Sequence, residues 1–164
     1  MLVARETNII AIKLDDGENL VSGLEQAFTQ NMIKSGIILG GIGMVTNFKL
    51  GYYTGKEYVS KEFSEPHELV NLQGSVAQGE GGKLMLHLHC TVGSQEHTTF
   101  GGHLMAAQVK NMAEIFAVRL MDTELRRRKS DRTGLMELEF HKVSDTKVPH
   151  STKHKSGSME LDLD

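Results

Sequence analysis

This 164-residue chain contains no tryptophan, two prolines and a single cysteine. Because Cys90 has no second cysteine to pair with, a fold held by disulfides within the chain is excluded. A lone thiol fits a reducing compartment, so we expect a cytoplasmic protein. No apolar run approaches the ~18 residues of a membrane span, and the first residues lack the basic start and apolar block of a secretory signal. We therefore expect no membrane partner.

An excess of positive charge is also missing. Lys and Arg number 18 against 21 Asp and Glu, which gives a formal net charge of −3. Broad affinity for nucleic acid needs clustered cations, so this balance argues against it. A solvated loop or edge strand is the simpler interpretation of the most basic run. That run is still a candidate nucleic-acid contact, through Arg126, Arg127, Arg128 and Lys129.

Aromatic residues make up only 5% of the chain and hydrophobic residues 39%. Leucine, isoleucine, valine and nine methionines must therefore fill the core. The length suits one domain, which we place at residues 1–143. Residues 144–164 are polar and show no hydrophobic period, so we expect a disordered C-terminal tail there.

The hydrophobic pattern predicts one helix among several strands. Apolar residues recur every fourth position from Leu20 to Met32, which predicts a core-packing helix over 19–34 that ends at Gly36. Residues 104–122 fit a helical stripe and an alternating strand equally well. Short apolar or alternating runs predict strands over 8–14, 37–39, 44–53, 56–63, 67–77 and 135–140.

The glycines Gly40, Gly41 and Gly43 suggest a dinucleotide-binding turn at first sight. That fingerprint requires a helix directly after the glycines. Here residues 44–53 have the alternation and the composition of a strand instead. We therefore expect the glycines to mark a β-bulge or a close approach between two backbones.

The main candidate site lies in the middle of the chain. In residues 84–91 the leucines and Cys90 recur at every second position, which predicts a strand with one buried face. His87 and His89 then project from the other face, with Cα atoms roughly 6.5–7 Å apart. His103 follows the pair Gly101-Gly102, which lets the backbone turn tightly and approach the strand.

Three histidines with room for water match the ligand count of an open zinc site. The expected cofactor is therefore a divalent metal, with zinc as the first choice because neutral imidazoles suit it. The simpler alternative stays open, namely three ordinary histidines on a half-exposed strand.

Other residues near this motif are weaker candidates for metal ligands or catalytic groups. Cys90 falls on the opposite strand face from His89, as a small buried hydrophobe would. His97 is either a solvated loop residue or a fourth ligand. Glu96 and Glu114 are the acids that could assist a metal-bound water, but no catalytic residue can be assigned. The sequence contains no G-x-S-x-G, P-loop or H-E-x-x-H motif.

Taken together, these motifs resemble a known family. H-x-H on a strand, a short polar loop and then G-G-H-L are similar to the signature of the PPC (plants and prokaryotes conserved) domain in its prokaryotic, metal-containing form. The resemblance covers roughly residues 5–141. It is supported by the segments G-G-I-G-M-V-T-N-F-K-L-G-Y-Y and E-L-V-N-L-Q-G-S.

This resemblance implies an α/β (α+β) fold with a mostly antiparallel sheet, a flanking helix and a homotrimeric assembly. It also implies that residues 109–121 form a strand and that His87, His89 and His103 hold the metal. The implied role is a ligand-binding or regulatory module for a small molecule. Two alternatives stay open, a metal-dependent hydrolase and a DNA-binding protein of the plant type. The plant proteins carry an A-T-hook core, R-G-R-P, which this sequence lacks.

Overall fold

The computed structural model describes residues 1–143, and this part of the chain forms nine strands, one α-helix and one 3-10 turn. Residues 144–164, the predicted tail, lie outside the described part. Within the described part, no helix combines the length and the apolar character needed to cross a membrane. In chain order the elements are β1 Leu2–Glu6, β2 Ile9–Asp15, α1 Leu20–Gln30, β3 Gly36–Tyr53, β4 Tyr58–Phe63, β5 His67–Gln78, η1 Glu80–Gly82, β6 Leu84–Gly93, β7 Thr99–Arg119, β8 Thr123–Lys129 and β9 Met136–Lys142.

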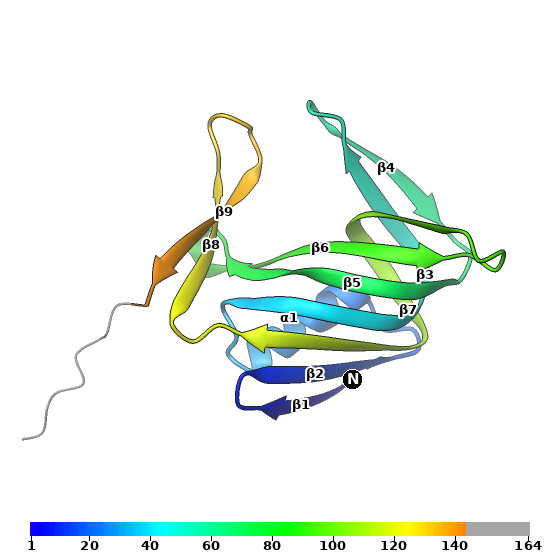
Figure 1. Ribbon diagram of the computed structural model, residues 1–164, viewed down its shortest axis with the longest axis horizontal. Helices are drawn as coiled ribbons and strands as arrows, with labels where there is room; N and C mark the ends of the chain where they lie inside the picture. Colours follow the sequence, from blue (N-terminus) through cyan, green and yellow to red (C-terminus); the bar gives the residue numbers. More distant parts are fainter. Residues whose placement is uncertain (144–164) are drawn as a thin grey trace, which may run out of the picture.

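The strands form one mixed sheet in which nearly all neighbours run antiparallel. The exception is a parallel bridge between β5 and β8, through Gln78 and Arg126. β3 pairs with both β5 and β7, and β6 pairs with the same two strands, so these four strands close a circuit. Figure 1 shows α1 behind this sheet and the hairpins β3–β4 and β8–β9 rising at its two ends. The predicted flanking helix and mostly antiparallel sheet are confirmed.

The core lies between α1 and the inner face of the sheet. Burying a large apolar side chain contributes roughly 1.5–3 kcal/mol, so the inward face of each strand is fixed by its apolar residues. The polar residues between them are thereby turned outward. The largest buried side chains are Phe28, Phe48, Ile10, Ile12, Leu14, Leu20, Leu24, Ile33, Ile38, Leu72, Leu88 and Ile115.

Helix α1 ends at Gln30 rather than at the predicted Lys34. The Asn31 side chain donates a hydrogen bond to the carbonyl of Ala27 and so satisfies the last turn. Met32 then adopts a left-handed φ of 55°, which cannot continue the helix. Its side chain is 71% exposed, so its assignment to the buried stripe is wrong.

The glycine-rich segment is a bulged part of one long strand, β3, as predicted for residues 40–43. The register with β7 shifts between Ile38 and Gly40 and again between Gly43 and Val45. Gly43 has a φ of +144°, and a Cβ there would lie 2.7 Å from the Cα of Ala113. The two predicted strands 37–39 and 44–53 are therefore continuous, and Gly43 permits the approach of β7.

Three other segments are strands that the hydrophobic pattern did not settle. Most of the ambiguous segment belongs to β7, which confirms the strand that the family resemblance implies for 109–121 as far as Arg119, where β7 ends. β1 shows no alternation because it is exposed over most of its length. The charged segment after residue 122 contains β8, which pairs with β9 to form a hairpin.

Candidate metal centre

Strand β6 carries two of the candidate ligands. Its inner face is buried, with Leu88 1% and Cys90 6% exposed. His87 and His89 project from the outer face, as the alternation of the sequence predicts. Their ring centroids lie 5.1 Å apart.

The third candidate ligand comes from the neighbouring strand. In the pairing of β6 with β7, His103 stands directly opposite His89. The preceding glycines do not form the expected tight turn, because both lie in register within β7. Their role is close approach, since a Cβ on Gly101 would lie 3.3 Å from the carbonyl carbon of Cys90 and closer still to its oxygen.

The three imidazoles form a compact triangle. The ring centroid of His103 lies 5.0 Å from that of His87 and 5.3 Å from that of His89. One candidate ligand nitrogen from each ring lies within 4.8 Å of the others. Nitrogens on a tetrahedral zinc ion are about 3.3 Å apart, so side-chain rotations that close a gap of at most about 1.5 Å would complete the site.

The surroundings of two of the three rings, His87 and His103, favour the neutral form. Burial, followed by the charge of Arg127 and the neighbouring histidines, lowers the pKa of His87 to about 4. Burial, with smaller effects of His89 and Arg127, also lowers the pKa of His103. Both rings are therefore neutral at neutral pH, and the neutral imidazole is the form that binds a metal.

One atom of the triangle lacks a hydrogen-bond partner. Among residues 1–143, nothing pairs with the buried Nδ1 of His103. A buried polar atom left unpaired costs about 1–3 kcal/mol. Coordination by His103 would give this ring a partner, so three clustered imidazoles and an orphaned nitrogen fit a divalent metal.

Two side chains that the sequence did not predict at this site border the triangle. The ring of Tyr58, from β4, lies 5.3 Å from that of His103. Arg127, from β8, lies against His87, with its Nη2 3.0 Å from Nδ1. The strand alternation of β8 could have indicated an inward Arg127, because it shares a face with the buried Leu125.

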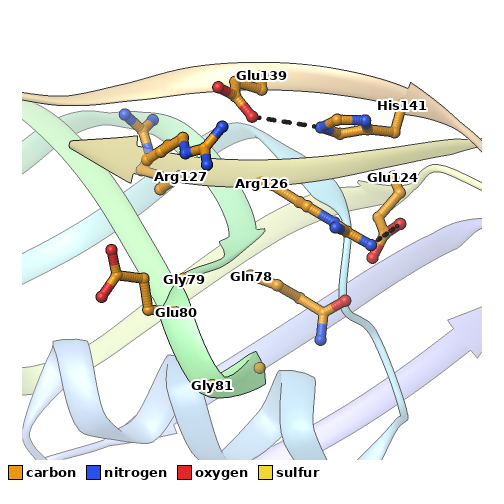
Figure 2. A pocket seen from close by; sticks show the side chains of 11 residues that line it. Gln78, Gly79, Glu80, Gly81, Glu124, Arg126, Arg127, Glu139 and His141 are labelled. Atoms are coloured by element: carbon orange, nitrogen blue, oxygen red, sulfur yellow. Dashed lines mark hydrogen bonds and ion pairs between the residues drawn. The ribbon is translucent and has the colours of Figure 1, made fainter. Parts of the chain in front are cut away.

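The basic run of β8 does not form one cationic surface. Arg127 is half-buried, whereas Arg126, Arg128 and Lys129 are exposed. Figure 2 shows Arg126 directed to Glu124, where the two form a 2.9 Å ion pair. A cavity of about 520 Å³ lies between this hairpin and the 78–82 segment, and Figure 2 shows side chains that line it. The Arg126–Glu124 ion pair and a 3.4 Å contact between His141 and Glu139 belong to this lining.

The remaining sequence candidates lie outside the triangle. His97 is exposed in the β6–β7 loop and is not part of the ligand cluster. Glu96 accepts a 2.8 Å hydrogen bond from Ser94 in the same loop. Glu114 stands opposite Lys13 in the pairing of β7 with β2. Cys90 faces the core, and burial raises the pKa of its thiol to about 11.

Comparison with known proteins identifies the family and the fold of this chain. A model of the Plants and Prokaryotes Conserved (PCC) domain matches residues 1–121. The crystal structure of a plant- and prokaryote-conserved (PPC) protein from Pyrococcus horikoshii is similar at 30% identity and a TM-score of 0.74, over 84% of this chain and 93% of that one. A metal-containing protein from Archaeoglobus fulgidus is 31% identical, with a TM-score of 0.74, over 85% and 99% of the two chains.

Two further similarities bear on function. A protein from Bacteroides thetaiotaomicron, named only provisionally as DNA-binding, is 27% identical with a TM-score of 0.77, over 85% of this chain and 96% of that one. The bifunctional protein GlmU of Synechococcus sp. (strain JA-3-3Ab) is 27% identical over 143 residues. That match covers 86% of this chain but 22% of GlmU, so the chain spans about a fifth of the length of the curated relatives it matches.

Proposed function

Because this chain belongs to the Plants and Prokaryotes Conserved (PCC) domain family, we propose that it is a binding module built around one divalent metal ion. The ion, zinc as first choice, is held by His87, His89 and His103. The observation that carries the proposal is the meeting of these three imidazoles on one outer face, with ligand nitrogens within 4.8 Å. The similarity to a metal-containing archaeal protein supports it.

An ion bound by three histidines keeps a coordination position for a further ligand. One of the chain's own residues borders that position, because the ring of Tyr58 lies beside that of His103. An aromatic wall beside an open coordination position suits the capture of a small molecule. We therefore favour binding or regulation by a small-molecule ligand.

Hydrolysis and DNA binding have weaker support. Neither acid considered for hydrolysis belongs to the histidine cluster, because Glu96 is hydrogen-bonded to Ser94 in the β6–β7 loop and Glu114 stands opposite Lys13 of β2. For DNA binding, the pairing of β8 divides its cations between two faces, and Glu124 pairs with Arg126. The observation that favours DNA binding is the provisional name of the Bacteroides relative.

We also propose a homotrimer, as the family resemblance implies. Large apolar side chains lie exposed on the face of the sheet that points away from α1. Burying such a surface between copies contributes roughly 25 cal/mol per Å², and exposed apolar patches of this kind mark contact surfaces. The exposed residues are Ile37, Leu39, Ile42, Val70, Met112 and Phe116.

Metal content tests the central proposal. Protein purified without a histidine tag should contain close to one zinc per chain by plasma mass spectrometry. The double variant His87→Ala, His103→Ala should lose it, because one remaining imidazole cannot hold the ion. Substoichiometric metal that is the same in both proteins would contradict the proposal.

A further inference from the structure

The Arg127 side chain joins the β8–β9 hairpin to the histidine triangle. Its Nη2 donates to the Oγ of Ser75 at 2.8 Å and lies 3.0 Å from Nδ1 of His87. Its Nη1 donates to the carbonyl of Met136 in β9 at 2.9 Å. One guanidinium therefore touches β5, β6 and β9 at once.

The chemistry of the guanidinium decides which atoms of His87 are free. Arginine carries only donors and stays charged, so Nδ1 of His87 must be the acceptor in this contact. A neutral imidazole has one protonated nitrogen, which is then Nε2. With Arg127 in place, neither nitrogen of His87 offers a lone pair to a metal.

We propose that the Arg127 guanidinium blocks His87 in the metal-free protein. Metal binding then requires this guanidinium to leave His87, and the loss of that contact loosens the β8–β9 hairpin. This inference rests on the proposed function, in which the triangle binds a divalent ion. Repulsion acts in the same direction, because a guanidinium and a divalent cation that approach one ring repel each other.

The hairpin has few other attachments to the sheet. Its parallel bridge to β5 involves only Gln78 and Arg126. The backbone N–H of Leu125 donates to the Oγ of Ser35 at 2.9 Å, and the Leu125 side chain is buried. The hydrogen bonds of Arg127 to Ser75 and His87 are therefore a large part of the attachment between the β8–β9 hairpin and the sheet. The whole hairpin follows the residues 1–121 that the domain model matches.

Zinc affinity measured by chelator competition tests the inference on three full-length proteins. Arg127→Met removes every donor at His87. Arg132→Met is the matched control, because Arg132 lies in the β8–β9 turn and its side chain is 83% exposed. We expect Arg127→Met to bind zinc at least about tenfold more tightly than the wild type, since no charged hydrogen bond must be broken. The control should match the wild type.

The outcomes separate this inference from the proposed function. Equal zinc affinities of wild type and Arg127→Met, both clearly measurable, overturn the inference and leave the metal site intact. If neither the wild type nor Arg127→Met binds zinc, the proposed function itself is contradicted. A gain shared by Arg132→Met also overturns the inference, because it would report net charge rather than the contact at His87.

Two measurements on the wild type do not depend on how the variants fold. Nitrogen-15 NMR of the metal-free protein should show His87 as the Nε2–H tautomer, and an Nδ1–H tautomer overturns the inference. Hydrogen exchange should become faster in β8 when zinc is added, because the Arg127 link is released. Unchanged exchange in β8 with zinc bound overturns the coupling to the hairpin.

Discussion

Cys90 and His89 are adjacent in β6 but lie on opposite sides of the sheet, with Cys90 6% exposed in the core and His89 exposed on the outer face. The pleat of one strand therefore separates the thiol from the proposed ligands. A thiolate would compete strongly for zinc, so this separation limits the proposed donor set to imidazoles.

The first prediction concerns the reactivity of this thiol. Burial raises the pKa of Cys90 to about 11, so the thiol stays protonated and shielded at pH 8. A disulfide reagent such as dithionitrobenzoate should label less than about a tenth of the folded protein in an hour. The same reagent should label it fully in guanidinium chloride. Rapid labelling of the folded protein would show that Cys90 does not face the core.

The second prediction concerns the approach of β7 to β6. Gly101→Ala places a Cβ against the backbone of Cys90, which pushes His103 away from His89. We expect zinc affinity to fall at least about tenfold and unfolding to become easier by about 1–3 kcal/mol. Chelator competition and urea unfolding measure the two effects.

Gly55→Ala is the control for this variant. Gly55 has a φ of +92° with no atom within 4 Å of an added Cβ, so the substitution strains the β3–β4 turn without displacing the backbone of β6 or β7. It should cost about 1 kcal/mol of stability and leave zinc affinity unchanged. Wild-type zinc affinity in Gly101→Ala would disprove the role of the close approach.

The third prediction concerns pH. The pKa of His87 is about 4 in the folded protein, against an ordinary value of 6.5. Between these values the unfolded chain binds more protons than the folded one, so stability is lost as the pH falls from 6.5 to 4. Because the ring is only half-buried, we expect a loss of no more than about 2 kcal/mol.

Urea unfolding of the metal-free protein at pH 7 and pH 4.5 measures this loss. The variant His87→Gln should lose less stability over the same range, because glutamine does not titrate. Identical pH dependence in the two proteins would mean that His87 is not held neutral by its surroundings.

The fourth prediction concerns assembly. Light scattering should give about 54 kDa, three times the 18.1 kDa chain. Phe116→Lys places a charge in the exposed apolar face and should shift the mass towards 18 kDa. Gln26→Lys, on the exposed side of α1, should leave the trimer intact. A monomeric wild type at micromolar concentration would rule the trimer out.

The sequence predicts the part of the site that depends on local geometry. The alternation of β6 is enough to place His87 and His89 together and Cys90 opposite them. The approach of His103 follows from its glycine neighbours and from the family resemblance, although those glycines extend a strand instead of forming a turn. These features involve residues close in sequence or directly paired.

Features that depend on distant contacts were not predicted. Arg127 reaches His87 because β8 returns to β5 through one parallel bridge, which no local pattern encodes. β1 is exposed over most of its length, so its sequence shows no alternation of apolar and polar residues. The apolar pattern extends the predicted helix to Lys34 because Met32 continues the stripe, but the cap at Asn31 ends the helix first.

The most direct test of the central claim is a crystal structure of the zinc-loaded protein with anomalous data collected on both sides of the zinc edge. The account predicts one zinc peak per chain, with nitrogens of His87, His89 and His103 each about 2.0–2.1 Å away. It also predicts that the Arg127 guanidinium no longer contacts His87. A zinc peak elsewhere, or none at the triangle in protein that contains stoichiometric zinc, would contradict the account.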